Sequence, residues 1–479
     1  MKPPPFIADA EGFAAAQRRS ILFRTLGWFM GAEGVELDQL IKKIFCVALP
    51  ENTYDAPEPP LITLFGLPLL PLRLLCKTWR WRAEAAADSQ MEILTAGHFD
   101  RFFSALYRTL PGTKRLSPRD DSPPPPGERS TLPTTAVAAP GDIARLFLLA
   151  PLWSVLLLPF IPRRGLRLIK AFRQAVSIHA AASGHFARYP CSRFITPMDD
   201  LNHPARWLAF RRRGGRSWVV IQNGDRNLHP LFAFGRADVY CVFGTAYAEI
   251  LSVIGTRADA FPCVGAFYLN ERHSLLQGLL AERPIPRWDV LFIDQGVFPH
   301  NGLCADSGRA LLRLLAHVGE FARRHPERKV AVQLRPYAAD DPRRSAVLDA
   351  VAKVCPTTVE VLENDGHGSS YRNVLSARLA VTFESSLGFE AMALGCKTLF
   401  VNYSGDPAET LCPDARFQLT GSGGDFGVFE RRVLSLLEMQ LDEIPAAARA
   451  RHSAIDGRTM ERIARVLGTD LPVSRSPGA

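Results

Sequence analysis

The sequence predicts an α/β protein with two Rossmann-like parallel-sheet domains that face a cleft. A partly helical, membrane-associated region precedes them. Three observations predict this fold class. Short apolar segments alternate with helical segments from about residue 178 onward, polar clusters follow several of these segments, and two long apolar segments with basic ends occur before residue 178.

Length and composition agree with this class. The chain has 479 residues, too many for a single core, so two or three domains are expected. Hydrophobic residues make up 47% and charged residues 22%, as in globular proteins. The formal net charge of +9 favours a polyanionic partner, either an anionic membrane or nucleic acid.

Cysteine usage and the N-terminus indicate a cytoplasmic protein. The nine cysteines are an odd number without a C-x-x-C pair, which predicts reduced thiols in place of a disulfide framework or zinc site. The first residues, MKPPPFIADAEG, contain no continuous apolar region, so no secretory signal is expected.

Composition divides the chain into six parts. A proline-rich stretch at 111–141 is predicted to be an extended linker. The predicted parts are a helical, membrane-associated region (1–110), this linker, an apolar-basic membrane-associated segment (142–177), an N-terminal Rossmann-like domain (178–270), a C-terminal Rossmann-like domain (271–440), and a C-terminal helix and tail (441–479).

Two similar segments flank the linker. Leu61–Arg82 and Leu146–Arg173 are each an apolar run, broken by prolines and followed by a basic tail. The tails suit acidic head groups, and Trp79, Trp81 and Trp153 suit a membrane interface. We therefore expect re-entrant or surface-lying elements, peripheral or monotopic, on the inner membrane; buried helices with solvated basic ends are the alternative. Nucleic acid is disfavoured because no nucleic-acid-binding motif occurs.

The two α/β units follow from alternating elements. In the first, strands are expected at 193–197, 218–222, 239–243 and 260–264, with helices at 203–213 and 246–254, and residues 265–287 cross to the second unit. There, strands are expected at 290–294, 329–334, 359–362, 379–383 and 397–401, with helices at 307–324, 343–354, 370–376 and 386–394.

The stretch 383–402, FESSLGFEAMALGCKTLFVN, is the most informative. A strand leads into Ser385 and Ser386, which open a short helix, and Gly395 stands where a helix ends. A helix N-terminus of this kind binds anions such as phosphate, and Glu390, one turn on, is placed to accept hydrogen bonds from hydroxyls. A serine N-cap and an ordinary surface glutamate explain the same residues.

Other polar clusters also follow predicted strands. Because carboxyl ends of parallel strands share one edge, these clusters are expected to face one crevice. Asp199 and Asp200 could instead cap a helix, and Asn223-Gly224 could be an ordinary turn. The clusters comprise Asp199 and Asp200; Gln222, Asn223, Gly224, Asp225 and His229; and Arg335.

The predicted chemistry is the handling of an activated phosphate compound. Arg335 can offer a bidentate fork to a phosphate. No P-loop, no G-x-G-x-x-G after a first strand and no D-x-D at a strand end occur, which favours a metal-independent transferase without a cofactor. The base that activates an acceptor hydroxyl remains open among Asp199, Asp200, Asp225 and His229.

From about residue 193 to 401, the sequence resembles GT-B-type glycosyltransferases of bacterial surface-carbohydrate and capsule polysaccharide biosynthesis. Three stretches carry the resemblance: VVIQNGDRN, ADVYCVFGTAYAEILSVIGTRADAFPCVGAFYLN and VTFESSLGFEAMALGCKTLFVN. Asn223 and Ala266 depart from the residues usual in the family, His and Ser.

The resemblance implies a function and site roles. Gln222, Asn223 and Gly224 would line the cleft, Ser385, Ser386 and Glu390 would bind the donor's diphosphate and ribose, and Arg335 matches a family Arg or His-Pro motif. The implied activity transfers a sugar, or a sugar-like phosphate unit, from a nucleotide-activated donor to a lipid-linked or glycan acceptor. The alternatives are a sugar-nucleotide 2-epimerase and a non-catalytic membrane-associated scaffold.

Overall fold

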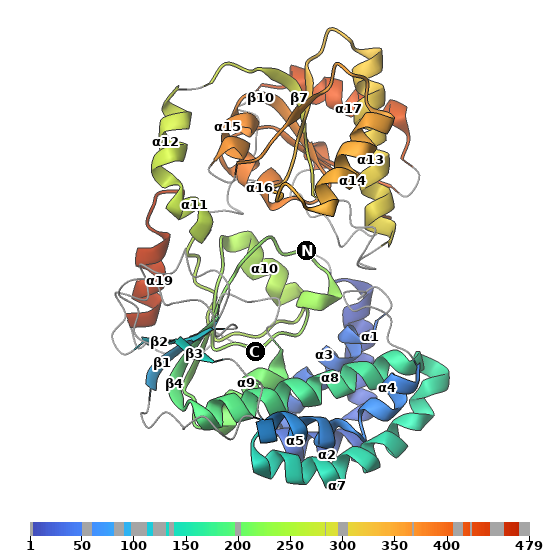
Figure 1. Ribbon diagram of the computed structural model, residues 1–479, viewed down its shortest axis with the longest axis vertical. Coiled ribbons are helices and arrows are strands. Elements are labelled where there is room, and N and C mark those ends of the chain that lie inside the picture. Colours follow the sequence, from blue (N-terminus) through green and yellow to red (C-terminus); the bar gives the residue numbers. More distant parts are fainter. Residues whose placement is uncertain are drawn as a thin grey trace.

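The computed structural model contains two parallel sheets and a layer of helices (Figure 1). It describes residues 3–49, 60–80, 91–96, 113–117, 131–133, 138–196, 203–282, 284–295, 305–365, 368–405, 415–421, 424–440 and 455–468. The predicted α/β class with two Rossmann-like domains and a partly helical N-terminal region is confirmed.

The N-terminal sheet has six parallel strands in the order β3-β2-β1-β4-β5-β6. Successive strands are added outward from β1 on one side and from β4 on the other, so the order of strand addition reverses between β1 and β4, as in doubly wound folds. The strands are β1 (Met91–Ala96), β2 (Thr113–Ser117), β3 (Thr131–Pro133), β4 (Cys191–Thr196), β5 (Ser217–Ile221) and β6 (Val239–Cys241). Helices α9 (Pro204–Arg212) and α10 (Thr245–Val253) and the 3-10 helix η3 (Pro230–Phe232) complete this domain.

The C-terminal sheet repeats this topology, in the order β12-β11-β10-β7-β8-β9, again all parallel. Its strands are β7 (Trp288–Ile293), β8 (Val330–Gln333), β9 (Glu360–Leu362), β10 (Ala377–Thr382), β11 (Thr398–Asn402) and β12 (Gln418–Thr420). Its helices are α13 (Ala305–Arg324), α14 (Pro342–Val354), α15 (Ser369–Leu375), α16 (Ser386–Ala393), η4 (Ala415–Phe417) and α17 (Phe426–Glu438). Two apolar clusters form its core.

The structure differs from the prediction in the first third of the chain. Strands β2 and β3 lie within the stretch 111–141, which we predicted to be an extended linker. With β1 they extend the N-terminal sheet, so this domain does not begin at residue 178. Conversely, the strand expected at 260–264 forms only isolated bridges. Ala260 pairs with Val239 of β6, and Cys263 pairs with Val242, the residue after β6. Whether each of these segments becomes a strand depends on pairing with a partner far away in the sequence, which sequence periodicity does not reveal.

In the described part of the chain, seven helices form a layer on one side of the N-terminal sheet domain, which we call the helical layer (Figure 1). Its helices α2, α3 and α8 pack against α9 of that domain. The layer shares one apolar cluster with that domain, and α8 packs against α3, α4, α7 and α9. The layer comprises α1 (Pro5–Gln17), α2 (Ile21–Met30), α3 (Gly34–Val47), α4 (Pro60–Gly66), α5 (Leu70–Arg80), α7 (Pro140–Leu157) and α8 (Ile161–Arg188), with η1 (Leu158–Phe160) between the last two.

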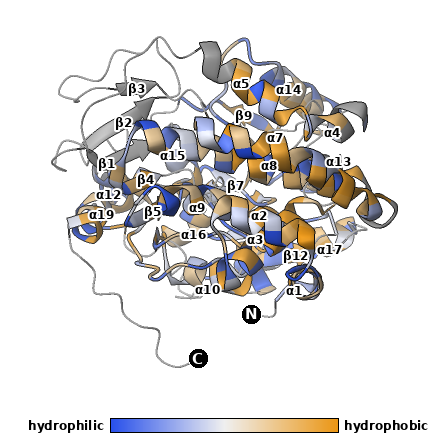
Figure 2. Cartoon of the chain, turned by 90° about the horizontal axis from the view of Figure 1, so that it is seen from below, coloured by the Kyte–Doolittle hydropathy of each residue, from blue (hydrophilic) through white to orange (hydrophobic). Residues whose placement is uncertain are grey.

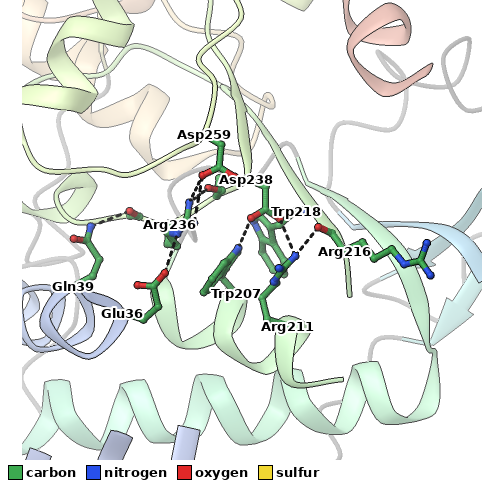
Figure 3. Close-up of polar contacts among 11 residues, drawn as sticks. Glu36, Gln39, Trp207, Arg211, Arg216, Trp218, Arg236, Asp238 and Asp259 are labelled. Carbon is green, nitrogen blue, oxygen red and sulfur yellow. Dashed lines mark hydrogen bonds and ion pairs between the residues drawn. The ribbon is translucent and has the colours of Figure 1, made fainter. Parts of the chain in front are cut away.

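Polar contacts fasten α3 to the sheet domain. The Gln39 side chain donates to the backbone oxygens of Gly235 and Gly255, at 3.1 and 2.7 Å. Nearby, the Asp238 carboxylate accepts from the Trp207 indole and the Trp218 backbone amide, at 3.0 and 2.7 Å (Figure 3). The Gln39 bonds hold α3 against the domain, whereas Asp238 satisfies buried donors within the domain itself.

The described parts of the two apolar-basic segments are largely helical. Leu61–Arg82 contributes to α4 and α5, and Leu146–Arg173 to α7, η1 and α8. In the part of the chain that the structure describes, the stretch Pro140–Phe160 is the one long and apolar enough to cross a membrane. Trp153 corrects our expectation of an interfacial side chain: it is fully buried, and its indole donates to Thr25 Oγ1 at 2.8 Å. Trp81 lies outside the described residues, and of Trp79 only the helical backbone is described.

Two segments join the domains. The connector contains α11 (Phe267–Glu271) and α12 (His273–Glu282) and leads into the C-terminal domain. The last helix, α19 (Thr459–Gly468), returns and packs against α11, with Ile463 and Leu467 buried in the core of the N-terminal domain (Figure 1). Thus the C-terminal helix belongs structurally to the first domain.

Candidate functional site

The C-terminal sheet reverses its strand order between β7 and β10, which is the position where open parallel sheets bind ligands. The polar residues that follow these two strands meet there. The side-chain oxygen of Gln295, after β7, accepts a hydrogen bond from the backbone amide of Glu384, after β10, at 2.9 Å. This bond fixes the turn that leads into α16.

The two serines at the start of α16 have different partners. Ser385 caps the helix, because its hydroxyl accepts from the backbone amide of Leu387 at 3.3 Å. The hydroxyl of Ser386 accepts from the backbone amide of Asp225 in the other domain, at 3.4 Å. The alternative of a serine N-cap therefore describes Ser385, whereas Ser386 lies at the contact between the two domains.

The loop after β5 supplies the opposing side. Asn227 donates from its side chain to the Glu384 carboxylate at 3.3 Å, a second contact across the domains. The Asp225 carboxylate accepts from the Tyr247 hydroxyl at 2.5 Å. Two loops that are far apart in the sequence are thus held against each other by polar groups.

Gln222 and its neighbours shape this loop. Gln222 is fully buried, donates to the Gly224 carbonyl at 2.7 Å and accepts from the Phe243 backbone amide at 2.9 Å. These bonds tie together the carboxyl ends of β5 and β6. Asn223 accepts from the Arg226 guanidinium, so both predicted donor-binding side chains have partners within their own domain.

His229 lies just beyond the loop and is buried. Its Nδ1 atom accepts from the backbone amide of Leu231 at 3.1 Å and so caps η3. A ring nitrogen that accepts a backbone hydrogen bond is not available at that atom as a base. Asp199 and Asp200, the first two candidates for the base, lie outside the described residues.

Glu390 occupies the centre of a polar cluster formed by both domains and the connector. It is buried, not on the surface, and the Tyr371 hydroxyl donates to its carboxyl group. Burial raises the pKa of Glu390 to about 7, although the Tyr371 and Tyr268 hydroxyls and the positive charge of Arg272 act in the opposite direction. Glu390 is therefore an acidic group that titrates near neutral pH.

The connector provides two members of this cluster. The Tyr268 hydroxyl is buried close to Glu390. Burial raises the pKa of Tyr268, and the negative charge of Glu390 raises it further. The Arg272 guanidinium lies over the Tyr371 ring, 5.4 Å from its centre. Because the connector links the domains, a movement between them would change the surroundings of Glu390.

Arg335 follows β8 and is exposed. Its guanidinium donates to the Gln295 carbonyl at 2.7 Å, and its backbone amide donates to Asp294 at 3.4 Å. Asp341 caps α14 and pairs with Arg343. Arg335 therefore stands beside the Gln295–Glu384 turn, with the planar cation that phosphate recognition requires.

The structure thus brings together Arg335, Ser385, Ser386 and Glu390 with the loop that contains Asp225. Sequence reasoning missed Tyr247, Tyr268, Arg272, Gln295 and Tyr371 as members of the site. Gln295 was discoverable, because it is a polar residue directly after a predicted strand. The tyrosines and Arg272 lie within helices or the connector, where no local pattern distinguishes them.

No protein-family model matches the sequence, and no curated protein matches it. Among solved structures, the UDP-GlcNAc 2-epimerase from Methanocaldococcus jannaschii, in complex with UDP-GlcNAc and UDP, is 11% identical, with a TM-score of 0.47 over 79% of this chain and 99% of that one. The Neisseria meningitidis UDP-GlcNAc 2-epimerase bound to UDP-GlcNAc is 13% identical, with a TM-score of 0.44 over 79% and 99%.

The wall teichoic acid polymerase TagF is also similar. It is 10% identical, with a TM-score of 0.43 over 85% of this chain and 97% of that one. Similarity at these levels is too low to carry an argument about activity. The chain's own geometry defines its class: a GT-B-like protein in which two doubly wound domains meet at the carboxyl ends of their strands.

Proposed function

We propose that the protein is a GT-B-type transferase of surface polysaccharide biosynthesis. It transfers a sugar, or a sugar-like phosphate unit, from a nucleotide-activated donor to a lipid-linked or glycan acceptor. One observation carries the proposal. At the reversal point of the C-terminal sheet, a helix N-terminus, an exposed arginine and a buried titratable carboxyl group meet a polar loop of the other domain.

The chemistry of these groups supports donor binding. The start of α16 offers partial positive charge, and Arg335 offers a fork of N–H groups, so together they suit a diphosphate. Such groups stabilise a leaving diphosphate without requiring a metal ion. Glu390, one turn into α16, is the group proposed to recognise ribose hydroxyls.

Among the four residues that the sequence offers as the base, we favour Asp225. Asp225 accepts a bond from Tyr247 and lies at the domain contact, so it is better placed than His229 to take a proton from an acceptor hydroxyl. Asp199 and Asp200 stay candidates on sequence grounds alone.

A thermal-shift screen tests the proposal. The purified protein is measured with UDP-, CMP-, GDP-, dTDP- and CDP-linked donors, beside Ser386→Ala/Glu390→Gln. The exposed Ser252→Ala serves as the control. A ligand at 100 times its Kd adds about 2.7 kcal/mol of stability. A shift with one nucleotide, kept in the control and lost in the double variant, is the expected result; no shift with any donor would overturn the proposal.

A product assay then separates transfer from epimerisation. The donor that shifts the Tm is incubated with the enzyme and a lipid or glycan acceptor, and the released nucleotide is measured. Acceptor-dependent release of nucleoside mono- or diphosphate is expected. Conversion of the donor sugar without any acceptor would identify an epimerase.

A further inference from the structure

The helical layer exposes an apolar surface of unusual composition. Helix α7 buries one face, with Leu146, Ala150, Trp153 and Leu157 at full burial. The opposite face is also apolar, although it is exposed: Leu148 is 78% exposed, Val155 64% and Leu152 41%. Spacing of four and three residues places these three side chains on one side of the helix, which we call the outer face of α7.

Neighbouring helices extend this apolar surface. Helix α5 packs against α7 and exposes Leu72 and Leu75, and Leu69, the residue before α5, is also exposed. Helix α2 also packs against α7 and exposes Trp28, and the Arg145 guanidinium lies over the Trp28 ring, 5.4 Å from its centre. Figure 2, seen from the side of this layer, shows α7 and α2 largely in the colour of hydrophobic residues.

Charge distinguishes this surface from an ordinary protein contact. In the sequences of α2, α4, α5, α7 and α8, Asp142 is the single acidic residue, and it is buried and paired with Arg213. Exposed arginines are present in the same helices: Arg24, Arg73 and Arg167. Exposed apolar side chains on helices that also carry exposed arginines and no exposed carboxylate match the boundary between acyl chains and anionic head groups.

A second copy of this chain fits the surface less well. A symmetric contact would set the same patch against itself and so bring like charges together, with no carboxylate of these helices to offset them.

We propose that the outer face of α7, with the neighbouring leucines of α5 and Trp28, is a docking surface for an anionic lipid bilayer. It lies on the surface of the membrane and buries these side chains among the acyl chains. Since Gln39 and the buried Lys43 bind carbonyl groups of the N-terminal domain, docking orients that domain on the membrane. The proposal does not depend on the proposed transferase activity.

Vesicle flotation of the full chain tests the proposal. Vesicles of phosphatidylcholine alone are compared with vesicles that also contain phosphatidylglycerol. The test variant is Leu148→Ser/Leu152→Ser/Val155→Ser. The matched control is Ile285→Ser/Leu312→Ser/Val428→Ser, whose parent side chains are exposed on the other part of the chain. All six side chains are exposed, so the folds should persist, which circular dichroism verifies.

The wild type and the control should float with the anionic vesicles, and added salt should weaken this binding. The test variant should lose binding by at least about tenfold, since it removes apolar area from the membrane contact. Equal flotation of test variant and wild type, or no flotation of the wild type, would overturn the proposal. So would a wild-type dimer in light scattering that the test variant converts to a monomer. Donor-induced thermal shifts should survive in the test variant, which separates this proposal from the proposed function.

Discussion

The hydroxyl of Tyr371 donates a hydrogen bond to the buried carboxyl group of Glu390, on the side of the C-terminal domain that faces the connector. In the connector, Arg272 acts on both residues and Tyr268 acts on Glu390. The protonation of Glu390 therefore depends on residues of the connector that links the two domains.

Glu390→Gln should make stability less dependent on pH. The Glu390 pKa rises from 4.5 to about 7 on folding. Between these pH values the carboxyl group is ionised in the unfolded chain but still protonated in the folded protein, so rising pH favours unfolding. Above a pH of about 7 both states are ionised, and no further stability is lost. The wild type should lose up to about 1.4 kcal/mol per pH unit relative to the variant across this window.

Denaturant unfolding at pH 5, 6, 7 and 8 measures this difference. Tyr371→Phe is a companion variant: it removes a bond that lowers the Glu390 pKa, so the window should extend to higher pH. Parallel pH profiles of wild type and Glu390→Gln would contradict the prediction.

Alanine substitutions of the two serines at the start of α16 should lower the unfolding free energy by different amounts. Ser385→Ala removes the N-cap and should cost about 1 kcal/mol of unfolding free energy. Ser386→Ala keeps the cap and removes only the 3.4 Å hydrogen bond from the Asp225 amide. It should therefore lower the unfolding free energy by only about 0.3 kcal/mol. Urea unfolding of both variants checks the order; a larger loss for Ser386→Ala would show that the domain contact, not the cap, dominates.

Asp238→Ala should destabilise the N-terminal domain strongly. The substitution leaves the Trp218 amide and the Trp207 indole without their acceptor (Figure 3). A buried donor without a partner costs about 1–3 kcal/mol. Asp259→Ala is the control, because that carboxylate is exposed and pairs with Arg236 at 3.4 Å, a contact typically contributing less than about 1 kcal/mol. Similar Tm values for both variants would argue against this role of Asp238.

Gly255→Ala should cost more than Gly214→Ala. Both glycines have positive φ, +74° and +84°, so each substitution meets backbone strain of about 1–2 kcal/mol. At Gly255 a methyl group would also lie 2.5 Å from the Phe234 ring, whereas nothing lies within 4 Å at Gly214. The extra cost of overpacking is about 1–3 kcal/mol. Chemical denaturation compares the two; equal losses would mean that Phe234 moves without cost.

Much of the C-terminal domain was predictable. The strands β7, β8, β10 and β11 and the helices between them lie within a few residues of their predicted positions. Their apolar runs are buried on both faces of a parallel sheet and are bounded by turn residues, so the local pattern is strong. Position after a strand also located Arg335, Ser385 and Ser386 at one edge.

Other features depended on distant partners. Strands β2 and β3, TKRLS and TLP, have no apolar alternation, and they become strands by pairing beside β1. The Nδ1 atom of His229 accepts a hydrogen bond from the backbone amide of Leu231, a local contact that the residue type alone does not reveal.

The sequence by itself determined the α/β class, the repeated strand–helix order and the helix N-terminus at Ser385, because these arise from patterns over neighbouring residues. Only the tertiary structure decided that Trp153 is buried while Leu148 is exposed on the same apolar helix, and that Glu390 is enclosed by Tyr268, Arg272 and Tyr371. Burial and pKa depend on which distant side chains surround a group, and chain folding brings those together.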